Sequence, residues 1–134
     1  VEPHFLKKPM TRVCIFMSPF NVHVNRAPES GEVLQVEHID GQFLAAYDER
    51  ASNHNERCAV HLKTLAGDEI VFVQIAGWFA RRIVNYAKPG DTFSRGEIIG
   101  LIKFGSRMDL YLPKGVEIKV ALKQKVKAGE TIIA

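Results

Sequence analysis

The sequence predicts a mainly β fold: a small antiparallel barrel or sandwich, similar to barrel-sandwich hybrids, with at most one or two short helices. Short segments rich in Val, Ile and Phe alternate with turn residues along most of the chain. Glycine-containing turns separate several of these segments. With 134 residues, 46% of them hydrophobic, the chain is long enough for one domain with a modest core.

The strand predictions follow the apolar segments in chain order. Asp40-Gly41 and Ala66-Gly67-Asp68 are predicted to be hairpin turns. The stretch from Ala76 to Tyr86 fits either a short helix or an irregular strand, because Gly77 and the β-branched pair Ile83-Val84 weaken a helix. The predicted strands are Arg12–Met17, Gly31–Glu37, Gln42–Tyr47, Cys58–Thr64 and Glu69–Ile75.

A quasi-repeat in the last third of the chain favours the barrel-sandwich prediction. The stretches KPGDTFSRGEIIG and LKQKVKAGETIIA both run from a turn through Gly-Glu to an isoleucine pair and a small residue. Lipoyl- and biotinyl-type folds show such repeated halves packed face to face. Chance similarity of common turn chemistry is the alternative explanation.

Charge and cysteine content narrow the possible functions. The net charge of +3 is too small and too evenly spread to indicate nucleic-acid binding. Cys14 and Cys58 lie in no CxxC motif, which favours buried thiols over a disulfide and weakly favours a cytosolic compartment. No apolar run is long enough to predict a membrane-spanning helix, and the opening residues do not look like a secretory signal. Because the chain starts without methionine, we expect it to be a fragment or a processed product.

The dipeptide Gly105-Ser106, in the stretch FGSRMDLYLP, is the strongest candidate for chemistry. A serine after a glycine is usually only a turn. Here apolar strands on both sides would hold the serine hydroxyl against the glycine carbonyl, which has no neighbouring Cβ to block attack. An N-to-O acyl shift, elimination, hydration and loss of ammonia would then leave a pyruvoyl group at position 106.

Several polar residues are candidates to assist this reaction or to bind a substrate. His23 is the best base in the chain, although a lone histidine on a strand is more often structural. Arg26 suits an anion, with a surface ion pair as the alternative. The polar cluster from His54 to Arg57 is predicted to be either a solvated loop or a binding site. Asp109 is predicted either to orient a polar partner or to cap a turn. No spacing of His4, His38 and His61 indicates a metal site.

Four separated motifs resemble the short bacterial and archaeal form of phosphatidylserine decarboxylase: FMSPFNVHVNRAPESG, NER, QIAGWFARRI and RGEIIGLIKFGSRMDLYLP. The resemblance runs from about Arg12 to the C-terminus. It implies autocatalytic cleavage between Gly105 and Ser106 into a β subunit, residues 1–105, and an α subunit, residues 106–134, that carries the pyruvoyl cofactor. The pyruvoyl carbonyl would form a Schiff base with phosphatidylserine, release carbon dioxide and yield phosphatidylethanolamine. The residues expected at the site are Ser106, Gly105 and His23 for catalysis, and Arg26, Asn55, Glu56, Arg57 and Arg107 for the substrate.

The chain departs from the family pattern in two respects. Relatives carry an upstream SPADG-like motif whose aspartate takes part in self-cleavage, so we expect an N-terminal segment to be missing, or Asp109 to replace that aspartate. Longer relatives also have two histidines in an HxxH segment, where this chain has His23 and Arg26. His23 is therefore a candidate for cleavage or for decarboxylation.

The resemblance also implies partners and location. We expect a phospholipid substrate, a peripheral position on the cytoplasmic side of the cell membrane, a homo-oligomer, and neither metal nor nucleic acid. Candidates to enter the bilayer surface are Phe5, Phe20, Trp78 and Phe79, although such aromatic residues more often belong to a core. Two alternatives remain open: a non-catalytic carrier or binding module, although the chain has no Met-Lys-Met turn, and a pyruvoyl decarboxylase for a soluble amino acid.

Overall fold

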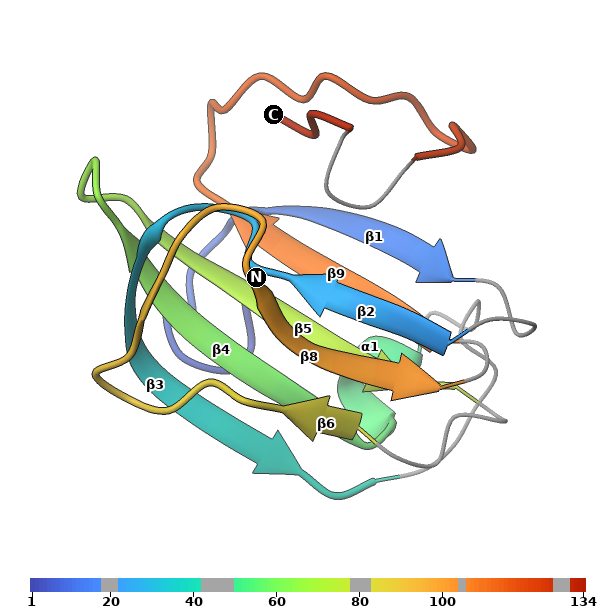
Figure 1. The fold of residues 1–134 in the computed structure, drawn as a ribbon. Coiled ribbons are helices and arrows are strands. Elements are labelled where there is room, and N and C mark those ends of the chain that lie inside the picture. The colour runs from blue at the N-terminus through green and yellow to red at the C-terminus, as the bar shows by residue number, and fades with distance from the viewer. Residues whose placement is uncertain (18–21, 42–49, 78–82, 104–105, 127–130) are drawn as a thin grey trace.

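Two antiparallel sheets pack face to face in a computed structural model of the chain (Figure 1). The structure describes residues 1–17, 22–41, 50–77, 83–103, 106–126 and 131–134; within them it leaves out the side chains at positions 22, 23, 52, 53 and 103. The elements are β1 (Thr11–Met17), β2 (Val22–Arg26), β3 (Gly31–Ile39), α1 (Ala51–His54), β4 (Arg57–Thr64), β5 (Glu69–Ala76), β6 (Ile83–Asn85), β7 (Thr92–Phe93), β8 (Ile98–Lys103) and β9 (Ser106–Leu112).

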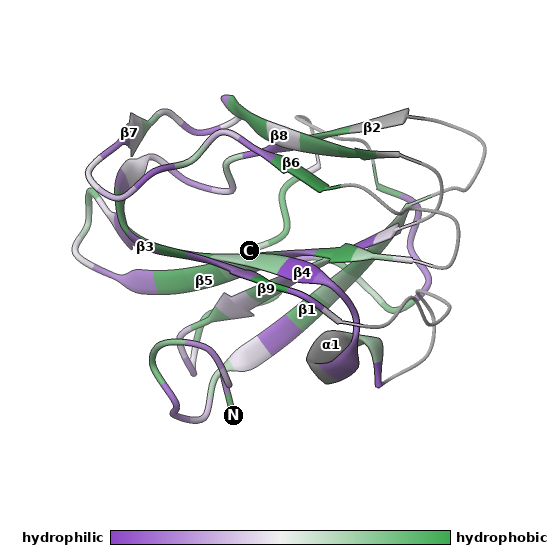
Figure 2. Ribbon diagram, turned by 90° about the horizontal axis from the view of Figure 1, so that it is seen from below, coloured by the Kyte–Doolittle hydropathy of each residue, from purple (hydrophilic) through white to green (hydrophobic). Residues whose placement is uncertain are grey.

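The larger sheet has the strand order β1-β9-β5-β4-β3-β7, and the smaller sheet has the order β2-β8-β6. Figure 2 shows the two sheets as layers, with the N-terminal segment and α1 on the outer side of the larger sheet. The mainly β, antiparallel prediction is therefore confirmed. In the described residues the sheets form an open sandwich and do not close into a barrel.

Strand β5 has apolar side chains on both faces of the larger sheet, and each face packs against other parts of the chain. Its sequence, EIVFVQIA, is almost continuously apolar, as expected for a strand buried on both faces. Ile70 and Phe72 join the core between the sheets, whereas Val71, Val73 and Ile75 join a second cluster on the outer face. Full burial of a side chain such as Phe72 contributes about 1.5–3 kcal/mol to the free energy of unfolding.

Most of the predicted elements agree with the structure. The predicted strands over residues 12–17, 31–37, 58–64 and 69–75 correspond to β1, β3, β4 and β5. The turn at 66–68 joins β4 to β5, where Gly67 has a φ of +93° and Thr64 N–H donates to the Asp68 carbonyl. The predicted strand at 42–47 lies outside the described residues, as do residues 78–82 of the stretch 76–86. Of the rest of that stretch, Ala76 is the last residue of β5 and Ile83–Asn85 is a strand.

The quasi-repeat does not appear as two equal halves. Its first copy contains β7 and the start of β8, joined by a turn in which Gly96 has a φ of +81°. The described residues of its second copy contain no strand. Similar turn chemistry in the two copies thus meets different tertiary surroundings, because among the described residues only those of the first copy pair with neighbouring strands.

Candidate functional site

Ser106 is the first residue of β9 and is completely buried. Its register partners are Met17 on β1 and Ala76 on β5. The N–H of Ala76 donates to the carbonyl of Glu56 at 3.0 Å, so these four residues form one row across the larger sheet. Residues directly opposite one another in a sheet share a face. Ser106 and Glu56 therefore lie on one face, two strands or about 10 Å apart.

The Ser106 hydroxyl donates to the Met17 sulfur at 3.8 Å. A thioether is a weak, neutral acceptor and cannot remove the proton. The contact therefore orients the hydroxyl without ionising it.

Two of the links that cross from one sheet to the other start or end beside Ser106. Strand β8 of the smaller sheet ends at Lys103, and β9 of the larger sheet begins at Ser106. Strand β1 ends at Met17, opposite Ser106, and β2 begins at Val22. His23, the predicted base, is the second residue of β2 and pairs with Ile102 of β8. Its side chain lies outside the described residues, as does Gly105.

Arg107 lies on the opposite face of the sheet from Ser106. It pairs with Ile75 and Phe16, and Ile75 belongs to the outer core cluster. Its guanidinium is 2.9 Å from the Asp109 carboxylate (Nε to Oδ1), and both side chains are buried. The guanidinium also lies 5.6 Å from the centre of the Phe16 ring. The structure thus separates Arg107 and Asp109 from the serine that precedes them.

Cys14 completes this outer cluster by pairing with Asp109. Burial, the Asp109 charge and a hydrogen bond to Asp109 raise the pKa of the Cys14 thiol to about 11. Burial alone raises the pKa of Cys58 to about 11. Both cysteines are free thiols, as predicted, and both stay protonated at neutral pH.

Arg57 also belongs to the outer face, where it contacts the N-terminal segment. Its Nε donates to His4 Nε2 at 3.1 Å, and its Nη1 donates to the Asn55 carbonyl at 2.8 Å. His4 Nδ1 lies 3.2 Å from the Glu2 carboxylate. Because His4 accepts at Nε2, it is neutral with its proton on Nδ1. The contact ties the first residues of the chain to β4.

Glu2 anchors this N-terminal hook, defined here as residues 1–10. Its buried carboxylate accepts hydrogen bonds from the backbone N–H groups of His4, Phe5 and Leu6 at 2.7–2.8 Å. Burial alone would raise the pKa of Glu2, but these backbone donors and the nearby His4 outweigh burial and lower it. Phe5, a candidate for membrane contact, stacks on His61 with ring centres 5.6 Å apart.

Asn55 forms a hydrogen bond to β5, the strand that lies beside Ser106. It is completely buried, and its Nδ2 donates to the carbonyl of Ala76 at 2.7 Å. Ala76 is the register partner of Ser106, so Asn55 holds β5 where it borders the serine. Arg26 lies at the far end of β2, where its Nη1 donates to the Gly96 carbonyl at 2.8 Å.

The sequence also matches a known family over almost its whole length. The profile of the family described as phosphatidylserine decarboxylase matches residues 3–134. The chain belongs to the phosphatidylserine decarboxylase family. This confirms the family predicted from the four motifs and favours an enzyme over a carrier module.

Curated relatives of this phosphatidylserine decarboxylase family member carry the name phosphatidylserine decarboxylase proenzyme. The Citrifermentans bemidjiense protein is 53% identical over 133 residues, 99% of this chain and 60% of the relative. The Streptomyces coelicolor protein is 55% identical over 123 residues, 92% of this chain and 56% of the relative. The chain thus spans at most about 60% of the length of these relatives. No solved structure shows a significant match.

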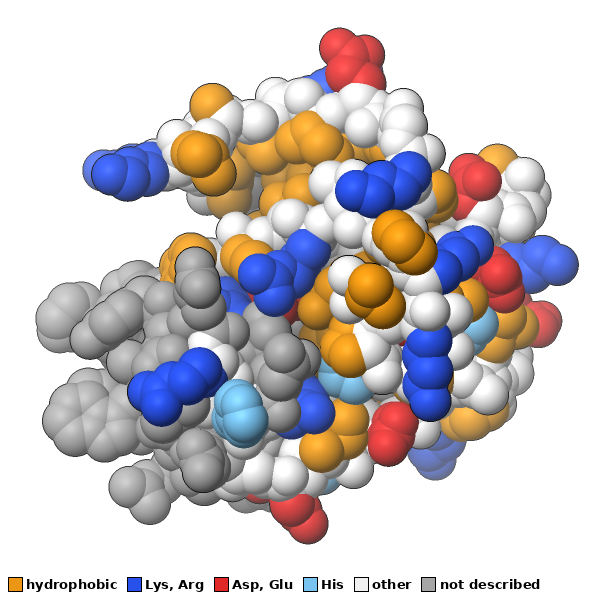
Figure 3. All heavy atoms as spheres, turned by 180° about the vertical axis from the view of Figure 1, so that it is seen from behind, with side chains coloured by type: hydrophobic (Ala, Val, Ile, Leu, Met, Phe, Trp, Pro, Cys, Tyr) orange, Lys and Arg blue, Asp and Glu red, His pale blue; other side chains and the backbone are white. Residues whose placement is uncertain are grey.

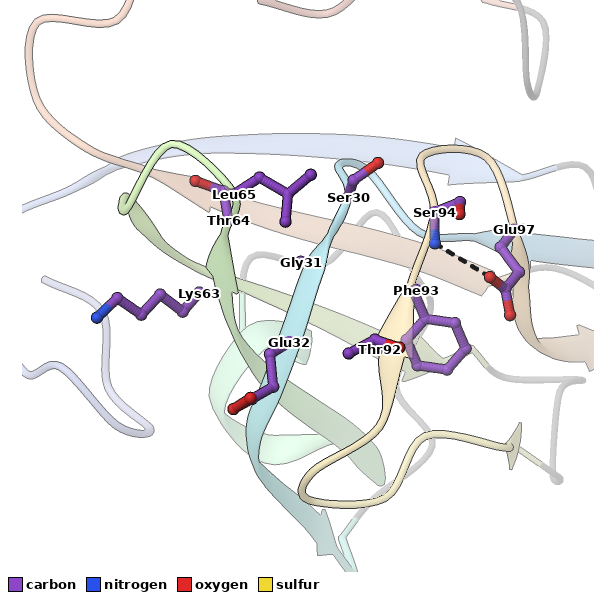
Figure 4. A pocket seen from close by; sticks show the side chains of 10 residues that line it. All are labelled: Ser30, Gly31, Glu32, Lys63, Thr64, Leu65, Thr92, Phe93, Ser94 and Glu97. Carbon is purple, nitrogen blue, oxygen red and sulfur yellow. Dashed lines mark hydrogen bonds between the residues drawn. The ribbon is translucent and has the colours of Figure 1, made fainter.

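A shallow groove lies at the other end of the sandwich (Figure 4). Its lining comes from the start of β3, the end of β4 and the region of β7. Along β4, Thr64 in this groove is seven residues from Arg57, roughly 20 Å. The groove is therefore too far from Ser106 to hold a reacting group against it.

Two side-chain groups were not predicted from the sequence. His38, Asp40 and Glu56 bring ligand atoms within 4.8 Å of one another, but Asp40 is almost fully exposed and we assign no metal to them. The second group is a set of amides between the sheets: Asn25, Gln74 and Asn85. Both groups join residues that are distant in the chain, so only the strand register could reveal them.

The side of the molecule that faces away from the viewer in Figure 1 carries side chains of several types. Hydrophobic, basic and acidic side chains are interspersed over its described part (Figure 3). Among the described residues, no helix has the length and hydropathy needed to span a bilayer.

Proposed function

We propose that this chain cleaves itself between Gly105 and Ser106 and then decarboxylates phosphatidylserine to phosphatidylethanolamine. The observation that carries the proposal is the position of Ser106: a buried, oriented hydroxyl in the first residue of a strand, in a chain from a family of proenzymes. Residues 1–105 would become the β subunit and residues 106–134 the α subunit.

The cleavage uses atoms of the chain and one water molecule. The Ser106 Oγ attacks the Gly105 carbonyl carbon, and the amide C–N bond breaks as the acyl group moves from nitrogen to oxygen. Elimination across the serine Cα–Cβ bond releases the Gly105 carboxylate and leaves an enamine at position 106. Its imine tautomer takes up water and loses ammonia, which leaves the pyruvoyl carbonyl. We assign His23 the role of base.

The sheet topology is compatible with cleavage of the peptide bond between Gly105 and Ser106, which lies between β8 and β9. Strand β8 lies between β2 and β6, and β9 lies between β1 and β5. Each strand therefore keeps hydrogen-bonded neighbours on both sides after the covalent link is lost. The residues around Ser106 also suit an uncharged group, because its register partners Met17 and Ala76 are neutral. A pyruvoyl group supplies an electrophilic carbonyl that binds an amine and withdraws electrons during decarboxylation.

Glu56 is the predicted substrate residue with the best position for the amino group. It shares a face with Ser106, and its side chain is 19% exposed. A carboxylate here would attract the ammonium of the serine headgroup before it loses a proton. We assign Asn55, Arg57 and Arg107 to holding the sheet and Arg26 to holding the turn at Gly96, because each is occupied by such contacts.

We also propose that the protein meets its lipid at the cytoplasmic surface of the cell membrane, as a peripheral homo-oligomer. A lipid substrate requires the site to open at a bilayer surface. Phe16 supports this end of the sandwich as the contact, because it is 55% exposed and its strand neighbour Met17 is the register partner of Ser106.

Intact mass spectrometry of the protein expressed from its full reading frame tests the proposal. We expect two fragments, one ending at Gly105 and one starting at position 106, and a mass increase of the second fragment after borohydride reduction. Ser106→Ala should stay whole and release no carbon dioxide from phosphatidylserine vesicles. A wild-type protein that stays whole, or that prefers free serine or aspartate to the lipid, would overturn it.

A further inference from the structure

A buried amide network joins the two sheets behind Ser106. Gln74 on β5 is 1% exposed, and its Nε2 donates to Asn25 Oδ1 on β2 at 2.7 Å and to the Val84 carbonyl on β6 at 3.1 Å. Its Oε1 accepts from Asn85 Nδ2 at 2.7 Å. One side chain of the larger sheet is thus bonded to both edge strands of the smaller sheet.

The network continues to the serine hydroxyl through a sulfur atom. Asn25 Nδ2 donates to Met17 Sδ at 3.6 Å, and Ser106 Oγ donates to the same sulfur at 3.8 Å. Asn85 Oδ1 accepts from the N–H of Ala87 at 2.8 Å, so each amide has a defined orientation. The sequence of contacts therefore runs from β6 through β5 and β2 to the end of β1, opposite Ser106.

Gly100 makes room for this network in the middle of β8. It is the register partner of both Asn25 and Asn85. A Cβ at this position would lie 2.8 Å from Gln74 Nε2 and 2.0 Å from the Val84 carbonyl oxygen. The backbone of β8, the strand that precedes the Gly105-Ser106 bond, is thus packed directly against the amide of Gln74.

The energetics suggest a role other than stability. Amide groups in a core lose their hydrogen bonds to water, so a bonded buried pair gains little over apolar side chains of similar shape. A satisfied polar network instead favours one arrangement of the packed elements. Here that arrangement is the position of β2, which carries His23, relative to β9, which carries Ser106.

We propose that Met17, Asn25 and Gln74 are positioning residues for self-cleavage. They hold the Ser106 hydroxyl and strand β2 at a fixed separation, and this inference rests on the proposed function. Attack on a carbonyl needs the reacting atoms about 3–3.5 Å apart, and a shift of about 1 Å can cost about a hundredfold in rate. Apolar packing alone would let the two sheets slide without breaking a directional contact.

The sharpest test compares two methionine variants. Met17→Leu removes the sulfur acceptor but conserves volume and apolar character. Met108→Leu is the matched control, because Met108 lies on the same face of β9 as Ser106 and packs against the core between the sheets. Cleavage is followed in cell-free translation of the full reading frame by the fraction of chain that remains intact. Thermal unfolding of each variant is measured with Ser106→Ala added, so that cleavage does not interfere.

We expect Met17→Leu to slow cleavage by at least about tenfold and to leave the thermal midpoint within the range of Met108→Leu. The pH at which cleavage reaches half its maximal rate stays the same, because the sulfur takes no proton. Gln74→Met, which keeps the length of the side chain but loses all three hydrogen bonds, is the second variant and is expected to slow cleavage as well.

Three outcomes would overturn the inference: equal cleavage rates for Met17→Leu and wild type, equal slowing by Met17→Leu and Met108→Leu, or a shifted pH midpoint. In each of these cases the wild type still cleaves at Gly105, so the proposed function stands. A wild-type protein that never produces a fragment starting at position 106 overturns the proposed function instead.

Discussion

Ser106 and Arg107 are neighbours in the chain, but their side chains lie on opposite faces of the six-stranded sheet. Ser106 faces the smaller sheet and contacts Met17, whereas Arg107 pairs with Asp109 on the face covered by the N-terminal hook. Strand β9 thus carries the candidate reacting group on one side and a buried ion pair on the other. This separation lets the two roles be tested independently.

Asp109→Asn is expected to destabilise the protein strongly. The change leaves the Arg107 guanidinium buried without its counter-charge, which costs about 3–5 kcal/mol in the free energy of unfolding. Urea unfolding monitored by circular dichroism, in the Ser106→Ala background, measures the loss. Arg95→Gln, which breaks the exposed pair with Glu29, is the control and should leave the urea midpoint unchanged. Equal effects of the two variants would contradict a structural role for the buried pair.

The contact between His4 and Arg57 predicts a loss of stability in mild acid. Burial lowers the pKa of His4; the Glu2 charge opposes this shift and the Arg57 charge adds to it. In the unfolded chain His4 binds a proton near pH 6.5, whereas in the folded chain it binds one only at lower pH. The free energy of unfolding therefore falls as the pH drops below about 6.5. Urea midpoints measured between pH 7 and pH 5 check this prediction.

His4→Gln should flatten this dependence on pH, since the variant has no titrating group at the position. His54→Gln, at an exposed position, should retain the wild-type slope. If both variants keep the slope, the N-terminal hook is not its source.

Gly100→Ala is expected to be among the most damaging single-methyl changes in the chain. The added Cβ would lie 2.0 Å from the Val84 carbonyl oxygen and would push β6 away from β8. We expect a loss of about 3 kcal/mol or more, measured by urea unfolding. Gly90→Ala is the control: its surroundings are open, but its φ of +92° costs about 1–2 kcal/mol. A smaller loss at position 100 than at position 90 would show that the strands adjust freely.

The two thiols are expected to react slowly at neutral pH. Their pKa values of about 11 leave little thiolate at pH 8. Iodoacetamide labelling followed by mass spectrometry should be much slower in the folded protein than in urea, and should accelerate as the pH approaches 11. The free energy of unfolding should fall above about pH 9, because the unfolded thiols ionise there and the folded ones do not. Rapid labelling of Cys58 at pH 8 in the folded protein would contradict this account of its burial.

Local patterns in the sequence predicted the strands and the family. The run EIVFVQIA indicated a strand because its apolar residues are β-branched or aromatic, and it forms β5. The quasi-repeat was less informative, since similar turn residues say nothing about which strands lie beside them. The substrate predictions for Arg57 and Arg107 followed from the family resemblance, and a motif does not specify which face of the sheet its residues occupy.

The mainly β fold, the membership of the phosphatidylserine decarboxylase family and the choice of Gly105-Ser106 as the bond to test could all be predicted from the sequence. These features are encoded in short stretches of neighbouring residues. The folded chain was needed to show that Glu56 shares a face with Ser106, that Arg107 does not, and that Gln74 reaches Asn25 and Asn85. Strand register and the packing of two sheets bring together residues that are far apart in the chain, such as Met17 and Ser106, and no local pattern records those pairings.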